Sequence, residues 1–137
     1  MIYLDPTAIM KLITQTPESP ALTDYLRLHT STTWFTCALS RAEVMRAAAA
    51  IHPDATEHAQ RVLAGLDLVA VTDRLLDAAI ALIPAPGRTI DALHIAAALS
   101  AGPRLHTLIT YQPELAHDTA DHNINAIHPG GSPCYAP

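Results

Sequence analysis

Three acidic residues occupy comparable positions in this sequence, although they are far apart along it. Asp5 follows the apolar run at residues 1–4, and Glu43 and Asp91 each lie within the first turn of a predicted helix. Each acid alone has a structural explanation, because carboxylates cap helix N-termini and are favoured there by the helix dipole. It is less convincing that all three acids, at such similar positions, serve only to stabilise helix starts. The sequence therefore predicts that the three carboxylates form one cluster.

A carboxylate cluster has a chemical consequence. Two carboxylates about 4 Å apart repel each other by about 1 kcal/mol in water and by about 4 kcal/mol at an effective dielectric constant near 20. Such a cluster is stable only with a cation or a shared proton. Oxygen ligands suit Mg²⁺, with Mn²⁺ able to substitute, and this kind of ion holds a phosphate oxygen and helps a carboxylate to activate water. We expect Asp5, Glu43 and Asp91 to be catalytic and metal-binding residues.

The elements that must position these acids can be read from the pattern of apolar residues and from the Pro and Gly residues between them. Short apolar or β-branched runs predict strands at 1–4, 32–38, 68–71, 107–111 and 124–127. Helical patterns lie at 6–13, 20–29, 40–51, 55–64, 72–83 and 114–120, with a further helix that Thr89 caps and that ends near Gly102. Ser40 and Glu43 match a capping box at the start of the third helix.

Strands that alternate with helices predict an α/β fold with three layers, in which a mostly parallel sheet of about five strands carries helices on both faces. We expect a single domain at 1–128 and a mobile tail at 129–137. Ligands of such sheets bind beyond the carboxyl ends of the strands, near a change in strand order. Asp5 directly follows the first strand and Gln112 directly follows the strand at 107–111. These positions, with Glu43 and Asp91, point to one end of the molecule.

The composition of the chain excludes several classes of protein. The chain has 137 residues, a formal net charge of -5 and two cysteines, which indicates a cytoplasmic protein without a disulfide framework. It has no apolar run long enough to span a membrane and no positively charged leader. The negative charge argues against a broadly basic nucleic-acid surface. Any contact with phosphate therefore depends on a few cations near the acids, for which the candidates are Arg41, Arg46 and Arg88.

Four blocks of the sequence, in this order and at these separations, resemble a known family. They read YLDPTAIMKL, LSRAEVMRA, RTIDALHIAAAL and LITYQPELA, and together they look like the PIN-domain ribonucleases, specifically the VapC-type toxins of bacterial type II toxin-antitoxin systems. The resemblance extends from residue 1 to about residue 128. The block that contains Asp91 and His94 is the most specific of the four.

The resemblance implies a Mg²⁺- or Mn²⁺-dependent endoribonuclease that hydrolyses phosphodiester bonds in cellular RNA. It also implies a homodimer and a cognate VapB-type antitoxin that neutralises the toxin. Within the site it implies that Asp5 and Asp91 are metal ligands and that Glu43 is the third acid. It assigns supporting roles to the hydroxyl groups of Thr7 and Thr110 and to His94.

Gln112 departs from the family pattern, because the family usually has an acid at this position. An amide can coordinate through its carbonyl oxygen but adds no negative charge. We therefore expect one tightly held ion at Asp5 and Asp91 and a weaker second position. Gln112 is retained as a supporting residue of the site.

Two other functions fit parts of the sequence. A PIN-like binding module with weak or no catalysis is consistent with Gln112. A phosphatase of the haloacid dehalogenase type would use Asp5 as a nucleophile, but Thr7 stands where that class has a second acid. Its downstream lysine is also missing, because Lys11, the only lysine, lies too early in the chain.

Overall fold

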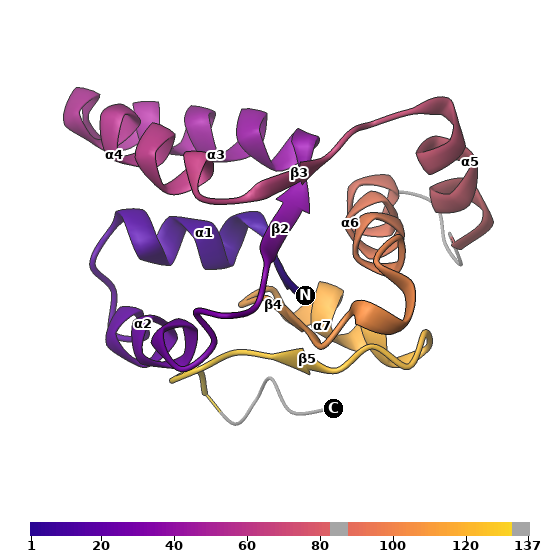
Figure 1. The fold of residues 1–137 in the computed structure, drawn as a ribbon. Coiled ribbons are helices and arrows are strands. Elements are labelled where there is room, and N and C mark those ends of the chain that lie inside the picture. The colour runs from indigo at the N-terminus through magenta and orange to yellow at the C-terminus, as the bar shows by residue number, and fades with distance from the viewer. Residues whose placement is uncertain (83–87, 133–137) are drawn as a thin grey trace.

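The computed structural model describes residues 1–82 and 88–132. Its centre is a sheet of five parallel strands in the order β3-β2-β1-β4-β5, which confirms the predicted parallel sheet (Figure 1). The strands are β1 (Ile2–Leu4), β2 (Trp34–Cys37), β3 (Asp67–Val69), β4 (Thr107–Ile109) and β5 (Ala126–Ile127).

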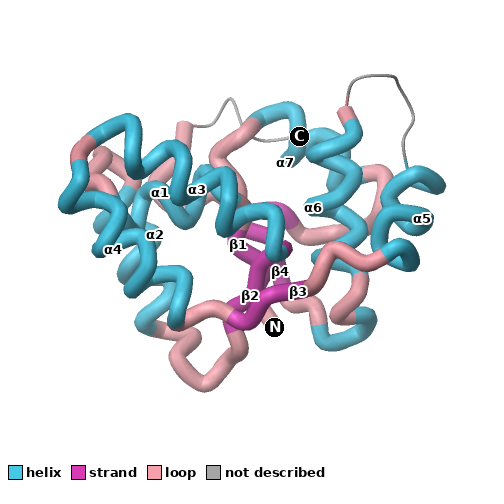
Figure 2. The backbone as a smooth tube through the Cα atoms, turned by 90° about the horizontal axis from the view of Figure 1, so that it is seen from above, coloured by secondary structure: helices cyan, strands magenta, loops and turns pink. Residues whose placement is uncertain are grey.

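Helices cover both faces of this sheet and complete the three layers (Figures 1 and 2). Helices α1 to α4 lie on one side and α5 to α7 on the other. The first group comprises α1 (Pro6–Ile13), α2 (Ser19–Arg27), α3 (Ala38–Ile51) and α4 (Pro53–Ala64). The second comprises α5 (Asp73–Leu82), α6 (Thr89–Leu99) and α7 (Pro113–Ala120), and a short 3-10 helix at Gly102–Arg104 follows α6.

The central strand β1 sends side chains into two separate cores. Ile2 and Leu4 join the core formed with α1 to α4, whereas Tyr3 joins the core that contains Phe35, Leu108 and residues of α5 to α7. This division results from the two-residue period of a strand, in which successive side chains point to opposite faces. Tyr3 is therefore directed towards the α6 side of the sheet.

The strand order changes direction at β1. The chain proceeds from β1 through β2 to β3 at one edge, and then returns so that β4 and β5 lie on the other side of β1. Leu4 is aligned with Ile109, and the N–H of Asp5 donates to the Ile109 carbonyl over 3.1 Å. Asp5 and Thr110 therefore emerge beside each other at the switch point of the sheet, which is where ligands of parallel sheets bind.

Two local predictions about helix starts are wrong. Helix α3 begins at Ala38, directly after β2, with Cys37 as its N-cap. Ser40 is therefore inside the helix and accepts a hydrogen bond from Thr36 over 2.7 Å, so no capping box forms. Thr89 is the first residue of α6, and Arg88 holds the N-cap position without a side-chain cap.

The segment after β5 is described as far as residue 132. The predicted mobile tail at 129–137 therefore lies partly outside the described residues, as does residue 83 of the predicted fifth helix. Within the described part, the Pro129 carbonyl accepts a hydrogen bond from the Tyr111 hydroxyl over 2.7 Å, which ties the start of this segment to the residues after β4. None of the described helices is long and apolar enough to cross a membrane.

Candidate active site

Asp5 is the most deeply buried of the predicted acids, with 1% of its surface exposed. Its Oδ1 accepts hydrogen bonds from the Thr7 hydroxyl over 2.6 Å and from the Ala8 N–H over 2.9 Å, and its Oδ2 accepts from the Thr110 hydroxyl over 2.6 Å. The bond from Ala8 also makes Asp5 the N-cap of α1. Burial raises the pKa of Asp5, and the hydrogen bonds from Thr110, Thr7 and Ala8 oppose this shift. Asp5 is therefore both a helix cap and an oriented carboxylate.

Both threonine hydroxyl groups are fixed by a second contact. The Thr7 hydroxyl accepts the N–H of Tyr111 over 2.9 Å, and the Thr110 hydroxyl accepts the N–H of Gln112 over 3.0 Å. Because each oxygen accepts from the backbone, its own proton is available to Asp5. The backbone that follows β4 thus orients the Thr7 and Thr110 hydroxyl groups, which donate to the Asp5 carboxylate.

Asp91 lies in the first turn of α6 and is contacted by Gln112. The Gln112 Nε2 group is 3.2 Å from Oδ1 and 3.4 Å from Oδ2 of Asp91. Burial raises the pKa of Asp91, and the neighbouring Asp118 carboxylate adds to this shift, whereas Gln112, His94 and Arg88 oppose it. Gln112, which stands where the family usually has an acid, therefore donates to Asp91 through its side-chain nitrogen.

His94 is hydrogen-bonded through both of its ring nitrogens. Its Nε2 is 3.0 Å from Oε1 of Glu43, and its Nδ1 is 2.6 Å from the Tyr3 hydroxyl. Proximity to His94 also lowers the pKa of Asp5 and of Asp91 slightly, after the larger effects of burial and hydrogen bonding. The imidazole is 2% exposed. Of the three acids, Glu43 is the one that His94 contacts directly.

The three candidate arginines are not equally placed. Arg88 forms an ion pair with Asp118, with 2.6 Å between Nη1 and Oδ1, and keeps 35% of its side chain exposed. Arg41 and Arg46 are exposed on α3, the helix that carries Glu43. Arg41 lines a groove with Met45 and Gln60. Arg88 also lowers the pKa of Asp91.

The chemistry of these groups fits a hard divalent cation. Across residues 1–82 and 88–132, no three His, Cys, Asp or Glu side chains are close enough to enclose an ion by themselves. Mg²⁺ is usually held by only one or two carboxylates and keeps several waters and substrate oxygens as its other ligands. The carboxylates of Asp5, which receives three hydrogen bonds, and of Asp91 are of the chemical type that such a smaller set needs.

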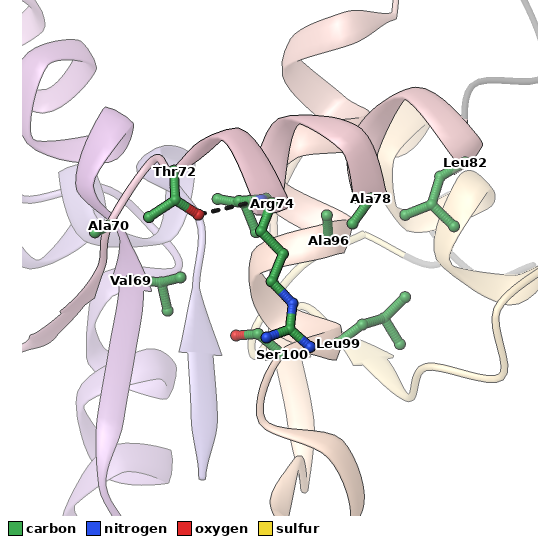
Figure 3. A pocket seen from close by; sticks show the side chains of 10 residues that line it. Val69, Ala70, Thr72, Arg74, Ala78, Leu82, Ala96, Leu99 and Ser100 are labelled. Atoms are coloured by element: carbon green, nitrogen blue, oxygen red, sulfur yellow. Dashed lines mark hydrogen bonds between the residues drawn. The ribbon is translucent and has the colours of Figure 1, made fainter.

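A separate cavity of about 640 Å³ lies away from the acids, between β3, α5 and α6. Its wall is mainly apolar, and Figure 3 shows the Arg74 side chain extending across it towards Ser100. Thr72 at its rim accepts the N–H of Leu75 over 3.1 Å at the start of α5. None of the predicted site residues lines this cavity.

Sequence reasoning missed two residues of this region. The sequence assigns Tyr3 only to a buried strand, yet its hydroxyl contacts His94. Asp118 lies on α7, is 9% exposed and pairs with Arg88. The alternation of β1 places Tyr3 opposite Ile2 and Leu4 and so gives its direction, but nothing local in the sequence identifies the partner of either residue.

Comparison with known proteins identifies related chains. The PIN domain family matches residues 2–116. Ribonuclease VapC46 of Mycobacterium tuberculosis is 46% identical over 114 residues, which cover 83% of this chain and 86% of the relative. Ribonuclease VapC35 of the same species is 36% identical over 133 residues, which cover 95% and 98% of the two chains. A chain from a toxin-antitoxin complex of Klebsiella pneumoniae has the same fold, with a TM-score of 0.70, 15% identity, and coverage of 96% of this chain and 100% of that one.

Proposed function

Because the chain belongs to the PIN domain family and is a VapC-type member of it, we propose that it is a metal-dependent endoribonuclease toxin. The reaction is hydrolysis of phosphodiester bonds in cellular RNA, in the cytoplasm. The cofactor is Mg²⁺, with Mn²⁺ able to replace it. The family membership argues against the phosphatase alternative, in which Asp5 is a nucleophile.

One observation carries this proposal: a carboxylate that is almost fully buried, Asp5, receives three hydrogen bonds at the switch point of the sheet. Burying a charged carboxylate is costly, and the three hydrogen bonds offset only part of this cost, since burial still raises the pKa of Asp5. The fold accepts this cost at the place where ligands of parallel sheets bind. A cation held by Asp5 and Asp91 offsets the cost and accounts for the arrangement.

The acids have different roles in this proposal. Asp5 and Asp91 hold the ion, which when bound supplies positive charge to a phosphate oxygen and lowers the pKa of a water. Glu43, with 35% of its side chain exposed, faces the solvent more than Asp5 does and accepts the proton of the attacking water. Thr7 and Thr110 keep the Asp5 carboxylate in one orientation, and His94 contacts Glu43.

Binding of the RNA backbone depends on few positive charges. Arg41 and Arg46 flank Glu43 on α3, and Arg88 lies beside Asp91. With a net charge of -5, we expect few phosphate contacts, a shallow dependence of binding on salt and selection of RNA by its shape.

The protein partners in this proposal are a cognate VapB-type antitoxin and a second copy of the chain. The dimer is supported by exposed apolar side chains on α5 and α6, the two helices that line the cavity of Figure 3: Leu76 is 40% exposed, Ile80 66% and Leu99 37%. Exposed apolar surface is typical of protein interfaces when it is contiguous. Light scattering of the Ile80→Asp variant tests this: we expect a monomer, and an unchanged dimer would exclude this surface.

Cleavage of total RNA with and without Mn²⁺ tests the proposed activity. We expect the wild type to cut RNA only with metal, and Asp5→Asn and Asp91→Asn to lose at least about a hundredfold in rate. Asp77→Asn is the matched control, because Asp77 is an exposed aspartate on α5. Intact RNA under every metal condition would contradict the proposal, as would aspartate variants that cut as fast as the wild type.

The second candidate, a PIN-like binding module, is favoured by Gln112, because its amide reduces the negative charge beside Asp91. The same experiment distinguishes it. A binding module would retain RNA in a filter assay with the wild type but release no new RNA ends with either metal.

A further inference from the structure

We propose that Tyr3 is a positioning residue of the site, whose buried hydroxyl orients His94 and through it the Glu43 carboxylate. The proposal rests on the proposed function, since it assigns to Glu43 the proton-accepting role described above. Tyr3 itself is completely buried and acts only through His94.

The contacts form a continuous chain through four segments of the fold. The Cys37 N–H, at the end of β2, donates to the Tyr3 hydroxyl over 3.2 Å. The Tyr3 hydroxyl on β1 is 2.6 Å from Nδ1 of His94 on α6. His94 Nε2 is 3.0 Å from Oε1 of Glu43 on α3. Tyr3, His94 and Cys37 are all buried, so the protein interior fixes every member except Glu43.

The direction of these hydrogen bonds is set by which atoms carry protons. A carboxylate only accepts, so His94 Nε2 must carry the proton that faces Glu43. In the neutral imidazole the other nitrogen, Nδ1, is then an acceptor. The Tyr3 hydroxyl already accepts the Cys37 N–H and is free to donate its own proton to Nδ1. Tyr3 therefore selects the histidine tautomer that donates to Glu43.

Ring packing restricts the orientation of the imidazole further. The rings of Tyr3 and Phe35 meet edge to face with centroids 5.2 Å apart, and those of Tyr3 and His94 with centroids 6.1 Å apart. A phenylalanine at position 3 would preserve this packing and remove only the hydroxyl. The hydroxyl is therefore needed for the hydrogen-bond chain and not for filling the core.

The hydrogen bond from His94 holds one of the two carboxylate oxygens of Glu43. A glutamate side chain has several rotatable bonds, and a partly exposed one adopts several rotamers unless a partner holds it. His94 engages Oε1, and within the described part of the chain no hydrogen bond to Oε2 is found. Oε2 is the oxygen that this arrangement presents to water or to the ion.

Nitrogen NMR of His94 tests the tautomer without any activity measurement. In the folded full chain we expect a proton on Nε2 and none on Nδ1 in the wild type, and a mixture of tautomers in Tyr3→Phe. Tyr25→Phe is the control, because Tyr25 lies on α2 and stacks on His29, and it should leave the His94 signals unchanged. A proton on Nδ1 alone in the wild type, or identical His94 signals in Tyr3→Phe, would overturn the proposal.

Kinetics of RNA cleavage test the consequence. We expect Tyr3→Phe to lower kcat about tenfold and to change KM less than twofold, because Tyr3 touches no substrate. His94→Gln keeps a donor for Glu43 but loses the acceptor for Tyr3, so it should retain more activity than His94→Leu. In the His94→Gln background, Tyr3→Phe should lower kcat less than twofold. An undiminished tenfold loss in that background would overturn the proposal.

The two experiments distinguish a failure of the proposed function from a failure of the proposal for Tyr3. If the wild type cuts no RNA, the proposed function fails, while the NMR measurement still decides whether Tyr3 sets the tautomer of His94. If Tyr3→Phe does not fold, the comparison of His94→Gln with His94→Leu decides instead. Equal activity of those two variants would contradict a chain of contacts that acts on Glu43.

Discussion

The hydroxyl of Thr110, just beyond β4, donates to Oδ2 of Asp5, just beyond β1, over 2.6 Å, although the two residues are 105 positions apart in the chain. The contact exists because β1 and β4 are parallel neighbours whose carboxyl ends coincide. It joins the two strands between which the strand order changes, and it holds the carboxylate on which the proposed function depends.

Replacing Thr110 with Val removes this donor and keeps the shape of the side chain. Because the bond is made to a buried carboxylate, we expect the free energy of unfolding to fall by about 1.5–3 kcal/mol and the rate of RNA cleavage to fall about tenfold. Thr110→Ser keeps the hydroxyl and should retain most of both. Chemical denaturation and single-turnover cleavage measure the two effects, and equal behaviour of Val and Ser at this position would refute the role of the hydroxyl.

Asp91→Asn should stabilise the protein in the absence of metal. Burial raises the pKa of Asp91 above its ordinary value of 3.8, so the folded state binds its proton more tightly than the unfolded state does. The resulting penalty is absent below pH 3.8 and grows as the pH rises through the raised pKa. Asp91→Asn removes the penalty, so its Tm at pH 7 should exceed that of the wild type by about 1–3 °C.

The pH dependence and a matched variant provide the controls for this stability difference. The gap in Tm between Asp91→Asn and the wild type should close as the pH falls below 3.8, and Asp77→Asn should show no gap at any pH. A metal-free Asp91→Asn variant that melts at or below the wild-type temperature at pH 7 would exclude a buried, unneutralised carboxylate at this position.

Titration with Mn²⁺ by calorimetry tests the consequence of Gln112. Its Nε2 group contacts both oxygens of Asp91, so it adds a donor where a second ion would need an acceptor. We expect one tight site in the wild type without RNA. Gln112→Glu places a carboxylate at the same length and should add a second site. Two comparable tight sites in the wild type would show that Gln112 does not limit metal binding.

The exposed arginines of α3 can be tested by the salt dependence of RNA binding. A cation that contacts a phosphate of single-stranded RNA contributes about 0.7 to the slope of log Kd against log salt concentration. Arg41→Ala and Arg46→Ala should each weaken binding and lower the slope by about that amount. Arg27→Ala is the control, because Arg27 is exposed on α2 and pairs with Asp24. Unchanged slopes for both variants would exclude α3 from the RNA contact.

Sequence patterns predicted the sheet and the position of Asp5 for a clear physical reason. A buried strand is followed at once by an acid and then by Pro6. This order determines where the strand ends, where the helix begins and that the acid lies at the carboxyl end of the strand. Five strands and seven α-helices lie within the described residues, and the sheet is parallel throughout, as the alternation of elements indicates.

The predicted capping box, which was one reason for choosing Glu43 as a site residue, is wrong. The capping box that it was expected to complete does not form, because α3 begins two residues before Ser40. Its actual partner, His94, is 51 positions away. Local propensity describes contacts within a few residues, whereas this contact depends on how α3 and α6 are placed relative to β1.

The contacts of Tyr3, Gln112 and Arg88 are beyond sequence reasoning for the same reason. A tyrosine in an apolar strand indicates burial but not the acceptor of its hydroxyl. The amide of Gln112 can present either its oxygen or its nitrogen, and only the position of Asp91 determines which. Arg88 is a candidate phosphate contact by sequence, and its pairing with Asp118, 30 positions later, is evident only in the fold.

Anomalous X-ray scattering from crystals grown with Mn²⁺ tests the central claim most directly, because it locates the ion without reference to activity. We predict a peak about 2.2 Å from a carboxylate oxygen of Asp5 and of Asp91, with Glu43 held by His94 nearby, and no such peak in crystals of Asp5→Asn. A strong peak elsewhere, with none between Asp5 and Asp91, would contradict a metal site built on these two carboxylates.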